Sequence, residues 1–242
     1  MSRFAPSIPA ISIDRRRLLA TGAAALAAGT LSSAYAAGPQ PGESARSPQH
    51  ALEGLIEGNK RFISQPQECE IDLAGQRAQV AKGQKPWATV LSCADSRIPP
   101  ELVFGGRGLG ELFVARNAGN LADTSTIGTL EYGAAVLGSP LIVVLGHTRC
   151  GAVQGACEVV TKNATFPGSI GPMIYPIIPA ALAMRDKPGN YVDNAARESA
   201  QRTATRLGEM SHTLADLIEA GKLQILAAMY DLETGQVEYL SA

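Results

Sequence analysis

Short apolar segments alternate with helix-length segments along most of the chain. Four apolar runs have the length of a strand and are bounded by Gly, Pro or charged residues: 87–92, 111–115, 141–145 and 223–229. Helix-length segments lie between them at 124–138, 150–161 and 192–220. Strands that are apolar on both faces and alternate with helices are typical of a parallel sheet covered on both sides. The pattern predicts an α/β fold with a central, mostly parallel β-sheet of about four parallel strands flanked by helices.

Further elements are predicted at the two ends of this core. Residues 231–240, DLETGQVEYL, indicate a turn followed by an antiparallel edge strand. Near the other end, Ser47-Pro48 is typical of an N-cap followed by proline in the first helical turn. Apolar residues at helical spacing then predict a helix at 48–63, and shorter helices are expected at 71–82 and within 166–179.

The first 36 residues have the pattern of an export signal. Three arginines, Arg15 to Arg17, precede an Ala/Gly-rich apolar stretch at 18–31, and Ala34-Tyr35-Ala36 resembles a cleavage site. Paired arginines before leucines indicate the twin-arginine route and a periplasmic protein. An uncleaved membrane anchor is the alternative, but the stretch is shorter than the ~20 residues of a membrane span. We expect a twin-arginine signal peptide at 1–36, a flexible leader at 37–47 and one domain at 48–242.

Composition and charge restrict the class of protein. With 242 residues, 45% of them hydrophobic, the chain is long enough for one domain with a substantial core. The formal net charge of −1 gives no indication of nucleic-acid binding. Residues 37–242 alone are mildly acidic, because residues 1–36 contain four arginines and one aspartate. We expect no nucleic-acid partner and no stable membrane insertion once the signal is cleaved.

Polar residues directly follow three of the predicted strands. Because the carboxyl ends of parallel strands meet at one edge of an open sheet, these residues are expected to lie close together. The first strand is followed by Cys93, Asp95 and Arg97, the second by Arg116 and Asn117, and the third by His147 and Cys150. This convergence favours a functional site over scattered polar residues.

Two cysteines and a histidine in this group have the spacing of metal ligands. His147 and Cys150 are three residues apart, which brings both side chains to one face, and Cys93 joins them from the neighbouring strand. A Cys₂His set with a fourth position open for water is typical of catalytic zinc. Thiolate and imidazole also favour zinc over magnesium or calcium. The alternatives are a Cys93–Cys150 disulfide, which leaves the histidine unexplained, and a histidine that is merely buried.

The other two cysteines, Cys69 and Cys157, are interpreted as buried thiols. Cys157 lies seven residues after Cys150, which is about 10.5 Å of rise on one helix and too far to share one tetrahedral ion. A disulfide between Cys69 and Cys157 stays open, since an exported protein works in an oxidising compartment.

The carboxylate and the guanidinium beside Cys93 form a second candidate feature. Asp95 and Arg97 are two residues apart, so in extended backbone their side chains share a face and can pair. A guanidinium keeps a neighbouring carboxylate ionised and oriented. Zinc lowers the pKa of bound water towards neutrality, and an oriented carboxylate can accept a hydrogen bond from the resulting hydroxide. We expect a catalytic Asp/Arg dyad, with a structural salt bridge as the alternative.

These motifs resemble those of the β-class carbonic anhydrases, and the similarity runs from about Leu52 to Leu240. Residues 93–97, CADSR, are similar to the family's C-x-D-S-R motif, and 147–151, HTRCG, to its H-x-x-C-G motif. Segments 110–120 and 130–147 resemble the family's connecting segments. The resemblance implies one Zn²⁺ per subunit, bound by Cys93, His147 and Cys150, and reversible hydration of CO₂ to bicarbonate and a proton. It also implies a homodimer or dimer of dimers, with the active-site cleft at the subunit interface and the N-terminal helix reaching over the neighbouring subunit.

The resemblance extends to the substrate pocket. A plant-like subgroup with an open zinc lines its CO₂ pocket with Gln, Phe and Tyr, and the corresponding residues here are Gln84, Phe113 and Tyr132, with Gly151 of the second motif beside them. The other subgroup carries a bicarbonate regulatory site that includes a tryptophan, whereas the single tryptophan here, Trp87, lies in the first strand. We expect the plant-like subgroup, in which an apolar wall accommodates CO₂ and the Gln84 amide donates to the oxygen that gains charge.

The sequence leaves several points open. In the family, the residue at Asp95 can also become a fourth metal ligand and close the site. Carbonyl sulfide and carbon disulfide hydrolases keep the same zinc ligands, although no long tunnel-forming insertion is visible here. The segment 105–111, GGRGLGE, could suggest a phosphate-binding loop, but it leads into a strand rather than a helix. A zinc protein without turnover is disfavoured because the Asp95/Arg97 pair is intact.

Overall fold

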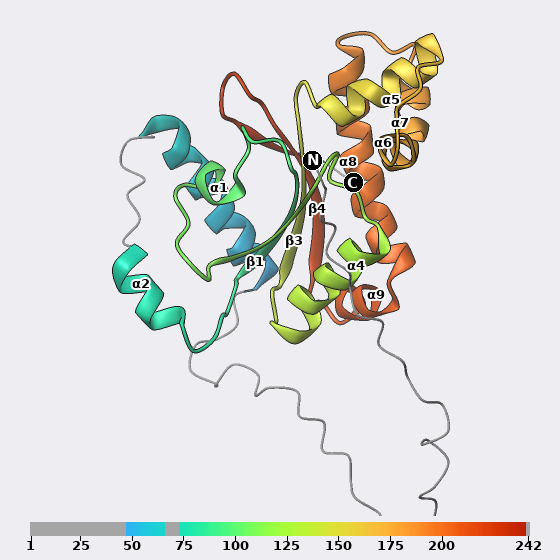
Figure 1. Cartoon of the computed structure of the whole chain (residues 1–242). Helices are drawn as coiled ribbons and strands as arrows, with labels where there is room; N and C mark the ends of the chain where they lie inside the picture. Colours follow the sequence, from blue (N-terminus) through green and yellow to red (C-terminus); the bar gives the residue numbers. More distant parts are fainter. Residues whose placement is uncertain (1–46, 66–72, 241–242) are drawn as a thin grey trace, which may run out of the picture. The chain divides into compact units, whose positions relative to one another are not determined.

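A five-stranded sheet forms the centre of the computed structural model, which describes residues 47–65 and 73–240 (Figure 1). The strand order is β2-β1-β3-β4-β5. The first four strands in the chain are parallel and the fifth is antiparallel to β4: β1 (Ala88–Cys93), β2 (Leu112–Asn117), β3 (Leu141–His147), β4 (Gln224–Tyr230) and β5 (Val237–Leu240). The predicted fold class, including the antiparallel edge strand, is confirmed.

The strand ends place the candidate ligands on the sheet itself. Every residue of β1 and β3 is buried, as expected for strands that are covered on both faces. The apolar runs end at Ser92 and Leu145, but backbone pairing continues to Cys93 and His147, which pair with Asn117 and Tyr230 respectively. Two of the three predicted ligands are therefore the last residues of neighbouring central strands.

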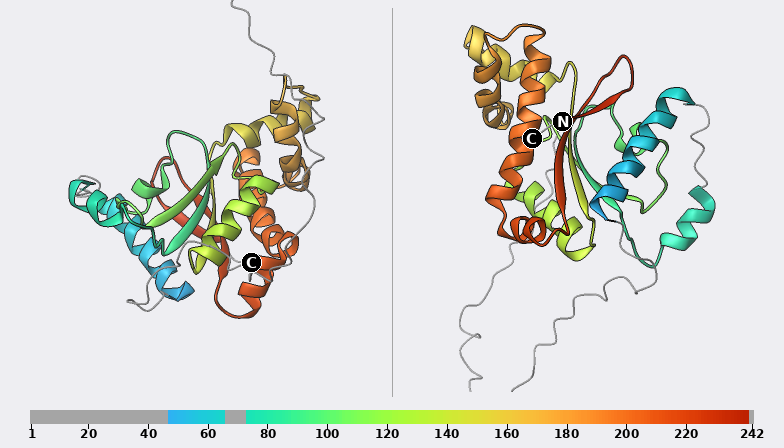
Figure 2. Two further views of the ribbon diagram at one scale, coloured as in Figure 1. Left: turned by 60° about the horizontal axis from the view of Figure 1, so that its bottom comes forward. Right: turned by 180° about the vertical axis from the view of Figure 1, so that it is seen from behind.

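Helices cover both faces of this sheet. In Figures 1 and 2, α1 and α2 lie on one side, and α5, α7 and α8 lie on the other. The bounds are α1 (Pro48–Ser64), α2 (Leu73–Val80), α3 (Pro100–Val103), α4 (Thr124–Glu131), α5 (Gly151–Lys162), α6 (Ile170–Ile174), α7 (Ile178–Met184), α8 (Tyr191–Met210) and α9 (His212–Glu219). Helix α8 packs directly on β3 and β4. Gly146 allows this approach, because a Cβ there would lie 2.8 Å from Met229 Sδ and 3.3 Å from Ala200 Cβ.

Helix α1 begins where the sequence predicts. The Ser47 hydroxyl accepts a hydrogen bond from His50 N at 3.2 Å, and proline follows in the first turn. The buried Asn59 ties the helix to its own chain: its side-chain nitrogen donates to Val103 O at 3.0 Å and to Gly235 O at 2.9 Å. That this helix also reaches over a neighbouring subunit stays a prediction.

Two of the predicted helical segments are divided. The segment at 124–138 consists of α4 followed by a π-helix, Tyr132–Val136, in which Leu137 N donates to Tyr132 O at 3.1 Å. The segment at 192–220 is interrupted at Ser211, which ends α8 and N-caps α9 by accepting from Leu214 N at 3.1 Å. A hydroxyl that competes for backbone donors explains the break, which apolar periodicity alone does not reveal.

The glycine-rich segment before β2 forms turns. Gly105, Gly106 and Gly110 have φ of 84°, 66° and 81°, a region that favours glycine, and the chain then enters β2. This arrangement agrees with the interpretation of the segment as a turn rather than a loop that opens a helix.

Some predicted features lie outside the described residues. The signal peptide at 1–36, most of the leader at 37–47 and Cys69 belong to this part of the chain. Among the residues that the structure describes, none of the helices is both long and apolar enough to cross a membrane.

Candidate metal centre

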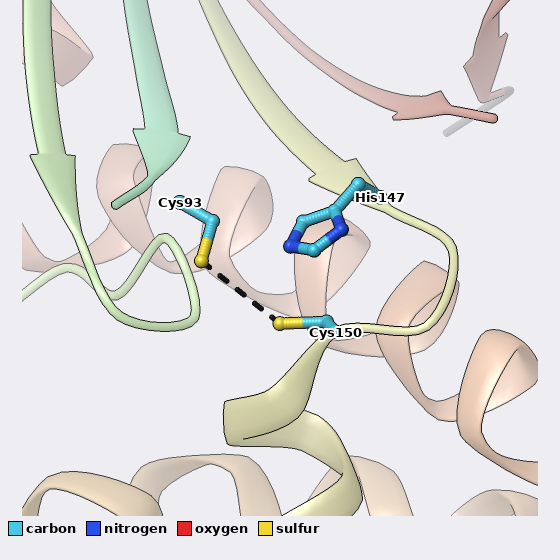
Figure 3. A group of neighbouring side chains, drawn as sticks. All are labelled: Cys93, His147 and Cys150. Carbon is cyan, nitrogen blue, oxygen red and sulfur yellow. Dashed lines mark hydrogen bonds between the residues drawn. The ribbon is translucent and has the colours of Figure 1, made fainter. Parts of the chain in front are cut away.

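Three predicted ligands form one buried cluster. Figure 3 shows Cys93 at the end of β1, His147 at the end of β3 and Cys150 just before α5, all directed towards one another. One donor atom of each lies within 4.8 Å of the others, and the two sulfur atoms are 4.0 Å apart. All three residues are buried, with 5% or less of their surface exposed.

The histidine presents a free nitrogen to the cluster. His147 Nδ1 lies 2.9 Å from Thr148 O, and because a carbonyl can only accept, Nδ1 carries the proton. Nε2 is then a lone-pair donor; it is buried and has no hydrogen-bond partner among the described residues. A buried nitrogen without a partner is unfavourable unless something binds it, and this tautomer is the one that metal-binding histidines adopt.

The two thiols share a polar environment that favours a thiolate. The hydrogen bond with Cys150 lowers the pKa of Cys93 to about 4, and the neighbouring His147 and the backbone N–H groups of Gly119 and Asp95 contribute to the same shift. The same hydrogen bond, together with burial, raises the pKa of Cys150. Both are free thiols, and their 4.0 Å separation is about twice an S–S bond length. The disulfide alternative does not describe this structure, and the donor set fits a soft divalent metal.

The turn that carries His147 and Cys150 is held by residues distant in sequence. Arg149 adopts a left-handed conformation with φ of 53°, which reverses the chain between the two ligands. Its backbone N donates to Asp193 Oδ1 at 2.7 Å, and its guanidinium pairs with Glu233 at 2.7 Å. Sequence reasoning did not identify these supports, because nothing in the motif indicates which distant carboxylates approach it.

Asp95 and Arg97 pair beside the cluster as their spacing predicts. Arg97 Nε and its second guanidinium nitrogen donate to the two carboxylate oxygens at 2.9 and 2.7 Å, and Arg97 N donates at 3.0 Å. These bonds hold the pKa of Asp95 well below its usual range, with the side-chain bonds from Arg97 as the largest cause. Asp95 Oδ2 lies 4.0 Å from His147 Nε2, so the ionised carboxylate lies next to the cluster.

The predicted pocket residues are divided between the two ends of the sheet. Gly151 directly follows Cys150 at the start of α5. Phe113 and Tyr132 lie together, with ring centroids 6.2 Å apart, but Phe113 pairs with Thr89, four residues before Cys93 on β1. Four residues of strand span roughly 13 Å. Gln84 is exposed in the loop that precedes β1, whereas Cys93 is the last residue of that strand.

A surface groove of about 840 Å³ lies next to this region. It is formed by the loop after β2, by α6 and α7, and by one face of α8, with Asn117, Leu121, Met173 and Arg202 among its lining residues. The three cluster residues do not line it. The groove therefore adjoins the loop that supports Cys93 but is a different feature from the metal centre.

Two further residues of the site lie near the end of β2 and in the loop that follows it. Gly119 N donates to Cys93 Sγ at 3.3 Å, and Arg116 donates to the backbone carbonyls of Cys93 and Asp95. The sequence predicts that Arg116 follows the second strand, whereas in the structure pairing continues and Arg116 lies within β2; its bonding partners are not predictable from the sequence. Gly119 gave no sequence signal beyond its place in the loop after β2.

The topology and the buried Cys-His-Cys cluster define an α/β protein with a metal-type ligand set, and the comparisons identify the family. The family model described as carbonic anhydrase matches residues 88–237. Carbonic anhydrase 2 of Mycobacterium tuberculosis is 35% identical over 189 residues, which cover 78% of this chain and 91% of the relative. The carbonic anhydrase of Mycolicibacterium smegmatis is 34% identical over 195 residues, covering 80% and 94%.

Solved structures show the same fold. The Coccomyxa β-carbonic anhydrase in complex with acetazolamide aligns with a TM-score of 0.61 at 24% identity, covering 78% of this chain and 86% of that one. A tetrameric β-carbonic anhydrase from Sordaria macrospora aligns with a TM-score of 0.61 at 22% identity, covering 70% and 91%. The chain belongs to the β-class carbonic anhydrase family, and it is an enzyme of that activity.

Proposed function

We propose that Cys93, His147 and Cys150 bind one Zn²⁺ and that the enzyme catalyses reversible hydration of CO₂ to bicarbonate and a proton. The observation that carries this proposal is the buried His147 Nε2, which has no hydrogen-bond partner among the described residues, in a cluster whose three ligand atoms lie within 4.8 Å of one another. Zinc, when bound, supplies a Lewis acid that brings the pKa of a water molecule close to neutrality.

Asp95 and Arg97 would orient the reacting water. The carboxylate is an acceptor only, because its pKa is held low by Arg97. It therefore accepts a hydrogen bond from the water and turns a lone pair of that water towards CO₂. Arg97 fixes both carboxylate oxygens, so Asp95 keeps this orientation at little entropic cost. This paired arrangement supports the open state of the site rather than the one in which Asp95 is a metal ligand.

The CO₂ pocket is proposed to be completed by a second copy of the chain, as a homodimer or a dimer of dimers. Phe113 and Tyr132 form an aromatic pair at the opposite end of the sheet from the cluster, and Tyr132 is 47% exposed. Within one chain these rings are too distant to contact a substrate at the metal. A partner's aromatic pair placed over the cluster would supply the apolar wall of the plant-like subgroup, with Gln84 as a donor to the developing charge.

The proposal is tested by measuring metal content and turnover together. Elemental analysis of the purified chain should find close to one zinc per subunit, and stopped-flow measurement with a pH indicator should show CO₂ hydration far above the uncatalysed rate. Chain without zinc would contradict the ligand assignment. Zinc-loaded chain with negligible CO₂ hydration and rapid carbonyl sulfide turnover would instead support the alternative, a carbonyl sulfide or carbon disulfide hydrolase.

Export by the twin-arginine route to the periplasm is part of the same proposal. It is supported by Arg15, Arg16 and Arg17 ahead of the apolar stretch, and by the small residues around Ala36. Because this route carries folded proteins, zinc could be inserted before export. The periplasmic protein should begin at Ala37 by N-terminal sequencing, and changing Arg15 and Arg16 to lysine should retain it in the cytoplasm. Normal export of that variant would contradict the route.

A further inference from the structure

Arg116 makes unusual contacts for an exposed arginine. It lies near the end of the edge strand β2, where it pairs in register with Ser92. Its Nε donates to Cys93 O at 3.0 Å and one terminal nitrogen donates to Asp95 O at 2.6 Å. Among the described residues it makes no salt bridge, and its guanidinium bonds these two carbonyls instead.

The two carbonyls belong to the segment where the sheet ends. Beyond the last residue pair of the two strands, Ala94 N still donates to Asn117 O at 2.9 Å, and the backbone then turns away from β2. Carbonyls in such a turn have no neighbouring strand to bond. The forked guanidinium of Arg116 spans the turn and bonds a carbonyl on each side of Ala94, which a single-donor side chain could not do.

This bridge joins a metal ligand to the dyad. Arg97 bonds the carboxylate of Asp95, whereas its backbone carbonyl accepts from Arg116 at 2.6 Å and, more weakly, from Ile98 N at 3.2 Å. Cys93 is held at its sulfur by Gly119 N and at its carbonyl by Arg116. The distance between the Cys93 sulfur and the Asp95 carboxylate therefore depends on a backbone turn, and Arg116 is the side chain that bonds both of its carbonyls.

We propose that Arg116 is a positioning residue that fixes the Cys93–Asp95 turn, so that the thiolate and the carboxylate keep the spacing needed for metal retention and turnover. The inference rests on the proposed function for its turnover readout, but not for its metal-retention readout. Arg116 acts through the backbone and does not contact the reacting atoms.

The test compares Arg116→Ala and Arg116→Lys with the parent enzyme. Loss of a residue that orients metal ligands typically costs about 10- to 100-fold in metal affinity or activity. We expect Arg116→Ala to lower kcat and to speed zinc release to a chelator within that range, with KM for CO₂ little changed. Arg116→Lys keeps the charge but donates from a single nitrogen rather than from a planar fork, so its kcat and zinc release should resemble those of the alanine variant more than those of the parent. Guanidinium ion at concentrations far below those that unfold proteins should partly restore Arg116→Ala and leave the parent unchanged.

A matched control separates this role from the general loss of an arginine. Arg197 also lies at the surface, where its partly exposed side chain pairs with the exposed Glu238 at 2.7 Å, so Arg197→Ala should leave zinc release and kcat unchanged. Parent-like zinc release and kcat in Arg116→Ala would overturn the proposal, and so would full recovery in Arg116→Lys. If Arg116→Ala fails to fold by circular dichroism, zinc release from Arg116→Lys decides. A parent that binds zinc but does not hydrate CO₂ would overturn the proposed function alone, because the zinc-release comparison would still stand.

Discussion

The two ends of the sheet differ in how much a single chain provides. At the carboxyl end of the strands, the cluster of Cys93, His147 and Cys150 is buried and each ligand is held by bonds within the chain. At the other end, Phe113 and Tyr132 pair with each other, and Tyr132 is exposed. The comparison indicates that one chain assembles the metal-type ligand set by itself, whereas the substrate pocket is expected to depend on the proposed assembly.

The largest effect is expected from removing a metal ligand. Cys150→Ala should lose zinc and bring hydration to the uncatalysed rate, because two remaining donors cannot hold the ion in a tetrahedral site. Cys157→Ala is a matched control: Cys157 is also a buried free thiol, seven residues along the same segment, and its loss should leave zinc content unchanged. Elemental analysis of both variants checks this, and zinc retained by Cys150→Ala would contradict the ligand assignment.

The next effect separates metal binding from orientation. Asp95→Ala should keep zinc and lose about 10²-fold or more in kcat, in the range typical of a group that handles a proton or its hydrogen bond. Asp216→Ala, at an exposed position on α9, should behave as the parent. Stopped-flow rates together with zinc content give the measurement. Parent-like turnover in Asp95→Ala would show that the Asp95–Arg97 pair is structural.

A smaller effect tests the assembled end of the sheet. Phe113→Ala should keep zinc and reduce kcat/KM by about tenfold, the order of the 1–3 kcal/mol that apolar pocket contacts supply. A mixture of the Phe113→Ala and Cys150→Ala proteins tests the location of the pocket more directly than either variant alone. In a mixed dimer, the zinc-bearing site of the first variant would receive the intact Phe113 of the second.

Activity of that mixture should exceed the sum of the two variants measured separately, because neither variant alone has a complete site. The same mixture of Phe113→Ala with Asp95→Ala should recover in the same way. Strictly additive activity, with mixed dimers verified by native mass spectrometry, would show that the aromatic pair does not act across subunits.

The sequence predicts the fold and the ligand set for a physical reason. Strands buried on both faces leave a continuous apolar signal, and the three ligands follow such runs directly, so parallel topology brings them to one edge. The spacing of His147 and Cys150 and the pairing of Asp95 with Arg97 depend on a few residues of local backbone. Local features of this kind are visible in a sequence.

Other parts of the site depend on contacts between distant segments. Asp193 accepts a hydrogen bond from the backbone of Arg149, 44 residues distant in sequence, and Arg116 donates to the backbone of Asp95, 21 residues distant. No periodicity or motif specifies such pairs, because they follow from where α8 and β2 lie in the folded chain. The location of Phe113 near the start of β2, away from the metal cluster, is also not predictable, because a sequence motif does not specify strand register.

The smallest effect concerns the turn between β4 and β5, which supports the metal end from within the chain. Leu232 N donates to Thr148 Oγ1 at 3.0 Å, so this turn holds the segment after His147. Within the turn, the Asp231 carboxylate accepts from Thr234 N at 2.7 Å and from Glu233 N at 2.8 Å. These bonds lower the pKa of Asp231 below its usual value, and the bond from Thr234 N is the largest cause.

A depressed folded-state pKa fixes the sign of the pH dependence. The stabilisation by Asp231 is present above its unfolded pKa of about 4 and is lost as the pH falls through the lower folded pKa. Asp231→Asn keeps one acceptor oxygen but loses the charge, so it should destabilise by about 0.5–1 kcal/mol at neutral pH. Urea unfolding of parent and variant from pH 7 to pH 3 should show the difference shrinking below about pH 4. A difference that is constant over this range would mean that the turn is held by geometry rather than by the charge.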